Sequence, residues 1–180
     1  MRRKYFNVKT YGYTGAMDDQ VDRILEQWRR ERPDVDVSGM GVIGRVSRLA
    51  VALAVELRRV FAEHGLEEWE FDLLATLRRH GAPFRLTAGQ LVAASMVTGG
   101  AVTNRIDRLE RRGYVRRERD DKDGRVVWVV LTDEGRAVVD AALPDHAANE
   151  LRMLEALSPD ERAQLAALAS KLHAGVRPPR

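Results

Sequence analysis

The sequence predicts a mainly α-helical protein that carries a small β-hairpin, and two observations support this. Apolar residues recur at helical spacing along most of the chain. Between residues 86 and 132, a short helix precedes a longer one with a polar outer face, and two short strands then flank a highly charged turn. Together these features predict a winged helix-turn-helix flanked by long N- and C-terminal helices, an architecture that mostly reads DNA.

The composition favours a cytoplasmic protein that does not associate with membranes. With 44% hydrophobic residues among 180, the chain can bury a core. It contains no cysteine, which excludes disulfides, thiolate redox sensing and cysteine-ligated zinc. The longest purely apolar run, Leu49 to Val55, is far shorter than the roughly 20 residues of a membrane span. The basic residues at 2–4 precede polar residues, unlike those of a signal peptide.

The N-terminal part divides into a tail and helices. Residues 1–16 have no periodic pattern and are expected to form a flexible tail. A helix should begin near Asp18 and end at Pro33, with one apolar face formed by Val21, Ile24, Leu25 and Trp28. A second helix is expected from about Gly41 to Glu63. We therefore assign residues 17–64 to N-terminal helices.

Residues 65–132 are expected to form the DNA-binding domain. A helix over 66–79 leads into the motif, where Thr87 and Gln90 have the spacing of a capping box. Thr98 is suited to cap the next helix, and Gly113 to end it in a left-handed conformation. Strands follow at about 115–118 and 126–131, joined by a turn at Lys122-Asp123-Gly124.

Residues 133–175 are expected to form the C-terminal helices. The first should begin after Thr132 and run to about Leu157, although Pro144 is expected to bend or interrupt it. The last should begin at Ser158-Pro159-Asp160-Glu161, which combines a capping box with proline at the first helical position.

The longer helix of the motif has a polar face suited to the major groove. At about 100° per residue, Ile106 and Leu109 lie within about 40° of Val102 and form the buried face. The opposite face carries Gly100, Asn104, Asp107, Arg108 and Arg111, with Thr103 at its edge. Asparagine can pair with adenine, arginine with guanine or phosphate, and a threonine methyl with thymine. The alternative is an ordinary solvated helix face.

The hairpin favours DNA binding because its cations are clustered. They are Arg116, Arg117, Arg119, Lys122 and Arg125, and a wing laid along phosphates needs such charges. Arg125 is suited to the minor groove. Asp120 and Asp123 are expected to fold back and fix its guanidinium, unless they simply keep the turn soluble. The expected DNA contacts are Thr98, Gly100, Thr103, Asn104, Arg108, Arg111, Arg119, Lys122 and Arg125.

Other classes of function have weaker support. The four histidines are scattered and form no HExxH motif, and the sequence has no G-x-S-x-G turn or glycine-rich loop after a strand. We therefore expect no enzyme, no cofactor and no metal site. A metal- or other effector-responsive regulator remains an alternative if histidines and acids converge in the fold. A winged helix that binds protein or RNA should lack the basic wing and polar outer face.

Four segments in order resemble the MarR (multiple antibiotic resistance regulator) family of bacterial transcription factors, over about residues 42–174. They are Leu86-Thr87-x-x-Gln90-Leu91, Val102-Thr103-Asn104-Arg105-Ile106-x-x-Leu109-Glu110-x-x-Gly113, Asp120-x-x-Asp123-x-Arg125 and Leu131-Thr132-x-x-Gly135. The resemblance implies a triangular homodimer with long N- and C-terminal dimerisation helices, which lie in residues 17–64 and 133–175. The dimer places two recognition helices in successive major grooves of a pseudo-palindromic operator. The resemblance also implies a repressor that releases DNA when a small, often aromatic or phenolic, ligand binds.

The N-terminal helix is similar to that of a branch that includes urate-responsive regulators. The similarity lies in Trp28-Arg29-Arg30-Glu31-Arg32-Pro33-Asp34 and Gly41-Val42-Ile43-Gly44-Arg45. It implies a ligand site made by Trp28, Asp72, Arg105 and Arg117.

Helical geometry places Arg105 about 60° from Val102, on the flank of the inward face. An anionic heteroaromatic ligand such as urate could stack on Trp28 and pair with Arg105, tilting the recognition helix. The alternatives are that Trp28 packs in a dimer contact and that Asp72 and Arg105 form a structural ion pair.

Overall fold

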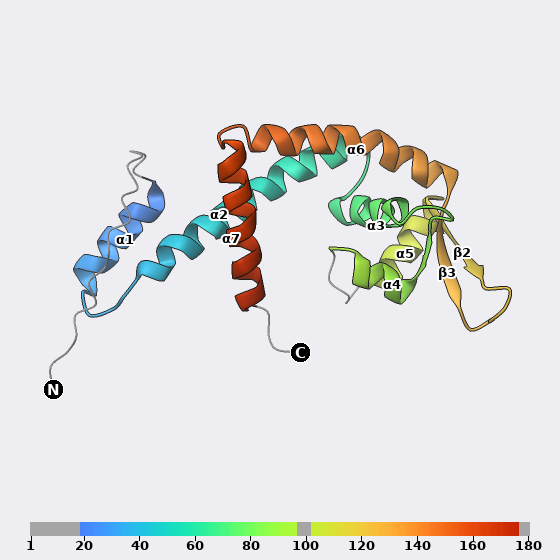
Figure 1. The fold of residues 1–180 in the computed structure, drawn as a ribbon, viewed down its shortest axis with the longest axis horizontal. Coiled ribbons are helices and arrows are strands. Elements are labelled where there is room, and N and C mark those ends of the chain that lie inside the picture. Colours follow the sequence, from blue (N-terminus) through green and yellow to red (C-terminus); the bar gives the residue numbers. More distant parts are fainter. Residues whose placement is uncertain (1–18, 97–101, 177–180) are drawn as a thin grey trace. The chain divides into compact units, whose positions relative to one another are not determined.

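The computed structural model describes residues 19–96 and 102–176, and it has the mainly helical, winged fold that the sequence predicts (Figure 1). The chain divides into two compact units between Val51 and Ala52, within a single long helix. The described part contains no helix that is both long enough and apolar enough to cross a membrane.

The first unit holds α1 (Gln20–Glu31) and the first part of α2 (Ser38–Glu63). Asp19 caps α1, because its carboxylate accepts hydrogen bonds from the amides of Val21 and Asp22 at 2.8 and 3.0 Å. The same carboxylate binds Arg45 of α2, 2.9 Å from Nε. Beside this ion pair lies a small buried cluster made by Val21, Leu25 and Val37. The two helices are therefore joined by a charged contact and an apolar one.

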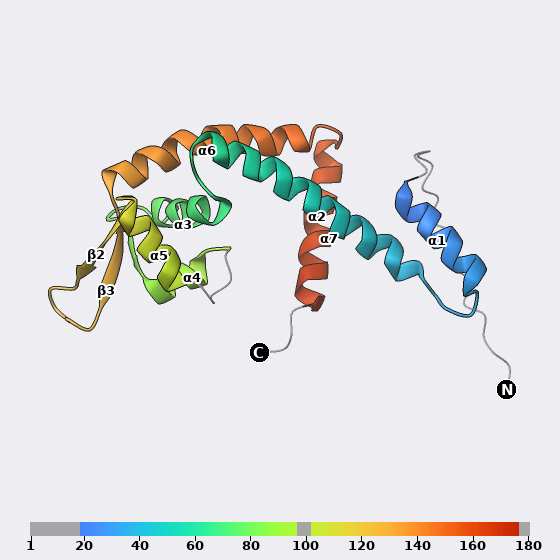
Figure 2. The ribbon, with the colours of Figure 1, turned by 180° about the vertical axis from the view of Figure 1, so that it is seen from behind.

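The second unit starts with the rest of α2 and contains the helix-turn-helix and the hairpin. Its other elements are α3 (Glu68–Arg79), β1 (Arg85–Thr87), α4 (Ala88–Ala94), α5 (Val102–Arg111), β2 (Val115–Arg119), β3 (Val127–Leu131), α6 (Asp133–Met153) and α7 (Pro159–Val176). Figure 2 shows from behind how β2 and β3 extend outward beyond α5. We call β2, β3 and the loop between them the wing.

The sheet has three antiparallel strands in the order β1-β3-β2, whereas the sequence predicts only the hairpin. Strand β1 pairs Leu86 with Val129. It was missed because three residues are too few for an alternating pattern to stand out, and its Thr87 also begins the capping box of α4. This strand anchors the helix-turn-helix to the wing.

The main core lies where α3, α5 and the sheet meet, and it extends to α6. Its fully buried side chains include Leu73, Leu77, Leu91, Ile106, Leu109, Val115, Val129 and Val139. Val139 and Ala142 place the first half of α6 in the same core as the recognition helix. The helix that follows the wing therefore also supports the DNA-binding elements.

Helix α6 begins as predicted but is not interrupted by Pro144. The hydroxyl of Thr132 accepts a hydrogen bond from the amide of Gly135 at 3.0 Å. A Cβ on Gly135 would lie 2.1 Å from the carbonyl oxygen of Tyr114, so only glycine fits this approach. Pro144 is exposed, and there water can replace the hydrogen bond that proline cannot donate. Of the bend or interruption expected at Pro144, the interruption is wrong, because α6 continues through the proline to Met153.

The last helix begins where the sequence predicts. Glu161 and Ser158 form the expected capping box, with bonds of 2.8 and 3.3 Å, and Pro159 is the first residue of α7. Helix α6 ends at Met153, four residues before the predicted end.

Candidate nucleic-acid interface

The helix-turn-helix is built by α4 and α5. The predicted capping box begins α4, because the amide of Thr87 donates to Oε1 of Gln90 at 2.9 Å and its hydroxyl accepts from the amide of Gln90 at 3.3 Å. Gly113 ends the α5 region with a φ of 75°, as expected for a left-handed residue. Thr98 and Gly100 lie outside the described residues, so their contacts with DNA stay predictions.

The recognition helix α5 has the inner and outer faces that its sequence predicts. Val102, Ile106 and Leu109 are buried. On the opposite side, Asn104 and Arg111 are exposed, and Thr103 is exposed at the edge. The outermost groups are thus a carboxamide and a guanidinium, both able to bond base edges or phosphates.

One flank of α5 packs against an aromatic ring of α3. The guanidinium of Arg105 lies 5.6 Å, and that of Arg108 4.7 Å, from the centre of the Trp69 ring. Arg108 also forms an ion pair with Glu67, just before α3. In the free protein, Arg108 therefore already has an anionic partner, which the sequence did not indicate.

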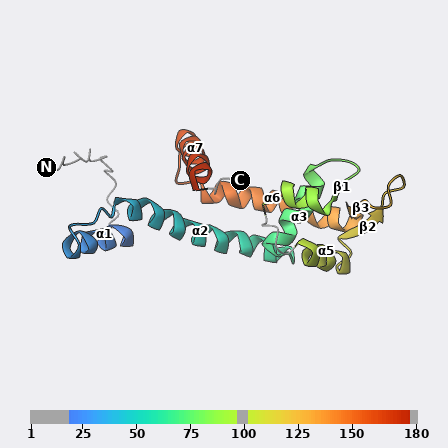
Figure 3. The same ribbon diagram turned by 90° about the horizontal axis from the view of Figure 1, so that it is seen from below.

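The other flank of α5 is tied to the base of the wing. The guanidinium of Arg117, on β2, lies 2.5 Å from Oδ1 of Asp107 and also bonds Glu110. The backbone amide of Arg117 donates to Oε1 of Glu110 at 3.0 Å. Burial of the guanidinium opposes its charge, but the two carboxylates raise the pKa of Arg117 above its ordinary value. Figure 3 shows α5 beside β2, where these contacts form.

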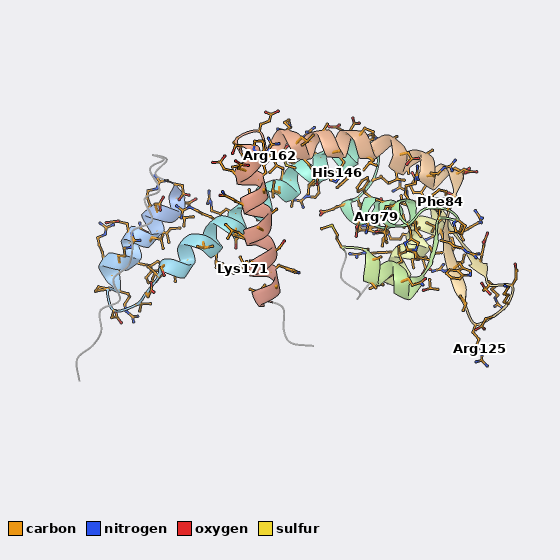
Figure 4. All side chains as sticks on the ribbon, viewed as in Figure 1. Arg79, Phe84, Arg125, His146, Arg162 and Lys171 are labelled. Carbon is orange, nitrogen blue, oxygen red and sulfur yellow. The ribbon has the colours of Figure 1, made fainter. Side chains whose placement is uncertain are left out.

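Arg116 and Arg117 of the wing are paired with carboxylates, and toward its tip the wing also presents the exposed cations Arg119, Lys122 and Arg125. Figure 4 shows Arg125 at the tip of the hairpin, pointing away from the rest of the unit. Such a side chain can reach into a groove while its neighbours follow the phosphates.

The acidic residues of the wing do not hold the Arg125 guanidinium, contrary to the sequence-based expectation. Asp120 instead accepts from the amides of Lys122 and Asp123 at 2.9 and 3.0 Å, and Asp123 accepts from the amide of Arg125 at 3.0 Å. Aspartate in tight turns commonly bonds the amide two residues ahead. The carboxylates therefore shape the loop and leave the guanidinium extended.

A second contact of the wing involves β1. The indole of Trp128, on β3, donates to Oδ2 of Asp120 at 2.8 Å. The guanidinium of Arg85, on β1, lies 4.7 Å from the centre of the Trp128 ring. An open depression of about 490 Å³ lies here, lined by Arg85, Glu118, Arg119, Asp120, Asp121 and Lys122. Arg85 adds a cation beside the wing that no sequence motif indicates.

The residues implied for a ligand site lie in both units. Trp28, on α1 of the first unit, is 44% exposed. In the second unit, Asp72 of α3 accepts from the amide of Met96 at 2.8 Å. Arg105 and Arg117 hold opposite flanks of α5 through the contacts given above. Nη1 of Arg105 is buried and has no hydrogen-bond partner among the described residues. This set of ligand residues stays a prediction.

A buried ion pair also went unnoticed in the sequence. Glu70 of α3 is 1% exposed and lies 2.6 Å from Nη1 of Arg112, whose Nη2 donates to the carbonyl of Gly65 at 2.9 Å. Glu70, Leu73, Leu74 and Leu77 have the spacing of one helical face, a signal that places the carboxylate inside. The pair fixes the end of α5 against α3.

Histidines and acids meet only in pairs within the described ranges. His64 lies 2.9 Å from Asp145, and His146 lies 3.4 Å from Glu150. Among these residues no three metal-ligating side chains converge.

Comparison with known proteins agrees with this geometry. Residues 64–126 match the model of the MarR family. The transcriptional regulator PecS of Dickeya dadantii is 42% identical over 153 residues, which cover 85% of this chain and 92% of the relative.

Two solved structures share the fold. One is Sco3205, a MarR family regulator of Streptomyces coelicolor in complex with DNA (TM-score 0.66, 26% identity, 76% of this chain and 87% of that chain). The other is BpsR of Bordetella bronchiseptica, whose DNA binding is regulated by 6-hydroxynicotinic acid (TM-score 0.64, 26% identity, 73% and 92%). These relatives are transcription regulators, not enzymes. The chain belongs to the MarR family of DNA-binding transcriptional regulators.

Proposed function

We propose that the protein is a homodimeric repressor that binds a pseudo-palindromic operator and releases it when a small aromatic or anionic ligand binds. The observation that carries the DNA-reading role is the outer face of α5. Asn104 and Arg111 are exposed there, while contacts with α3 and β2 hold the two flanks of the helix. A helix held on both flanks, with exposed polar side chains on its outer side, is suited to base readout.

Exposed apolar helix faces support a dimer. In the first unit, α2 exposes Val42, Ile43, Val46 and Leu49. In the second, α7 buries none of its residues and exposes Leu165, Leu168, Leu172 and Val176. Apolar faces of this length are stabilised when a second copy covers them. A two-fold dimer would present two copies of α5 to half-sites about one helical turn apart, and a protein seated on a promoter excludes polymerase.

Arg105 supports the proposal of a ligand site. Nη1 of Arg105 is buried and has no hydrogen-bond partner within residues 19–96 and 102–176, so it has hydrogen-bonding capacity that an anion would satisfy. Trp28, Asp72 and Arg117 complete the proposed set. The compound that regulates DNA binding of BpsR, 6-hydroxynicotinic acid, is a heteroaromatic acid. Urate and phenolic compounds have related chemistry, because each offers a flat ring with an acidic oxygen or nitrogen.

The test combines sedimentation with fluorescence anisotropy on DNA from upstream of the gene. We expect a dimer that binds this DNA tightly and is released by urate, 6-hydroxynicotinate or salicylate. Arg105→Ala should abolish the release but keep most of the DNA affinity, whereas Arg59→Ala, on the surface of α2, should change neither. A monomer would refute the dimer. Failure of all three compounds to release DNA, or normal release from Arg105→Ala, would refute the ligand site.

In the same setting, transcription from the upstream promoter should fall when the protein is added and recover with the ligand. Unchanged or increased transcription would refute the assignment as a repressor.

A further inference from the structure

Arg108 lies on the recognition helix, yet in the free protein its guanidinium is held by an acid from another element. We infer that Glu67 competes with DNA for Arg108 and so sets the DNA affinity of the recognition helix. This inference rests on the proposed function, because it assigns Arg108 to DNA.

The contact is organised by an aromatic side chain. One carboxylate oxygen of Glu67 binds Nη2 of Arg108, and the other accepts a hydrogen bond from Nε1 of Trp69 at 2.6 Å. The ring of Trp69 lies 4.7 Å from the same guanidinium. Trp69 thus fixes the carboxylate and also provides a cation–π surface for the arginine. A residue of α3 therefore fixes the Glu67 carboxylate beside Arg108.

Glu67 is charged under the conditions in which the protein would meet DNA. The hydrogen bond from Trp69 and, after it, that from Arg108 lower the pKa of Glu67 below its ordinary value. A fixed carboxylate next to a DNA-reading helix is repelled by the phosphates. Binding therefore requires Arg108 to exchange Glu67 for DNA, or requires Glu67 to approach the polyanion, and each route lowers the affinity.

Because the ion pair between Arg108 and Glu67 is exposed, Arg108 can leave Glu67 and bind DNA instead. The side chains of Arg108 and Glu67 are 46% and 57% exposed, and solvent-exposed ion pairs are weak. In contrast, the carboxylate of Glu70, which binds Arg112 on the same side of α5, is 1% exposed. Opening the Glu70 pair would strand a buried charge, whereas opening the Glu67 pair would leave both groups in water. The exposed pair can thus tune affinity while the buried one preserves the fold.

The test compares two neighbouring substitutions in the full-length protein. Glu67→Gln keeps an oxygen that can accept from Trp69 but removes the charge, and we expect DNA binding to tighten about two- to fivefold per half-site. Glu68→Gln removes an equal charge from the next residue, which is exposed and whose side chain forms no hydrogen bond or ion pair with the described residues. It should therefore report only the change in net charge. Circular dichroism and thermal unfolding serve to check that both variants fold.

Arg108→Ala separates the inference from the function beneath it. It should weaken DNA binding, and in its background Glu67→Gln should have no larger effect than Glu68→Gln. If Arg108→Ala does not change DNA affinity, the assignment of Arg108 to DNA is wrong. Suppose instead that Arg108→Ala weakens DNA binding. If Glu67→Gln then changes the DNA affinity only as much as Glu68→Gln does, or weakens DNA binding, competition is refuted and Glu67 instead supports the helix.

Discussion

The indole nitrogen of Trp128 lies 2.8 Å from a carboxylate oxygen of Asp120, across the β2–β3 hairpin. The other oxygen of Asp120 accepts two backbone amides of the loop. One carboxylate therefore joins strand β3 to the loop that carries Lys122 and Arg125. Because this loop presents the cations of the wing, its geometry should matter for DNA binding even though Asp120 is itself an acid.

Asp120→Asn should weaken DNA binding by about three- to tenfold, because a carboxamide has one acceptor oxygen and cannot satisfy all three donors. Removal of a negative charge alone would strengthen binding to a polyanion, so the loss has the opposite sign to a simple charge effect. Asp121→Asn, on an exposed residue of the same loop, is the control and should bind equally well or better. Tighter binding by Asp120→Asn would show that the acid only adds charge.

The same carboxyl group makes a pH prediction. The hydrogen bond from Trp128, followed by those from the loop amides, lowers the pKa of Asp120 below its ordinary value of 3.8. The bonded wing is therefore fully stabilised above pH 3.8 and loses this contribution only as the pH falls through the lower, folded pKa. Carboxyl NMR should give a midpoint below 3.8, and Trp128→Phe should raise it. A midpoint at or above 3.8 would contradict the wing geometry.

Arg112→Ala should destabilise the protein by about 1–3 kcal/mol, because it leaves the buried carboxylate of Glu70 without its cation. Denaturant unfolding measures the loss. Arg116→Ala, which removes an exposed arginine paired with Glu118, should change the free energy of unfolding by less than about 0.5 kcal/mol. Equal changes in the free energy of unfolding for the two substitutions would mean that the buried pair of Glu70 and Arg112 does not contribute more to stability than an exposed pair.

The sequence predicts the helices and the recognition helix well because their signals are local. The spacing of Val102, Ile106 and Leu109 and the Thr87–Gln90 capping box each lie within one or two turns. The partners of charged side chains are less local. Arg108 meets Glu67 across 41 positions, and Arg112 meets Glu70 across 42. No helical period reports which acid will face which arginine, so the competition for Arg108 became visible only in the fold.

The wing arginine should contribute through charge and not through a specific base. Arg125→Ala should weaken binding to all DNA sequences and reduce the slope of log affinity against log salt by about one per subunit. Arg125→Lys keeps the charge and should keep the slope. If Arg125→Ala leaves the slope unchanged, the wing does not bind the phosphates or the groove they border.

The most direct test of sequence reading by α5 compares wild-type protein and Asn104→Ala on a panel of single-base variants of the upstream DNA. The wild type should discriminate strongly among them. Asn104→Ala should lose about 1–3 kcal/mol of discrimination at one position of each half-site and keep it elsewhere. A uniform loss of affinity across the panel, with the base preference intact, would contradict the reading of bases by the outer face of α5.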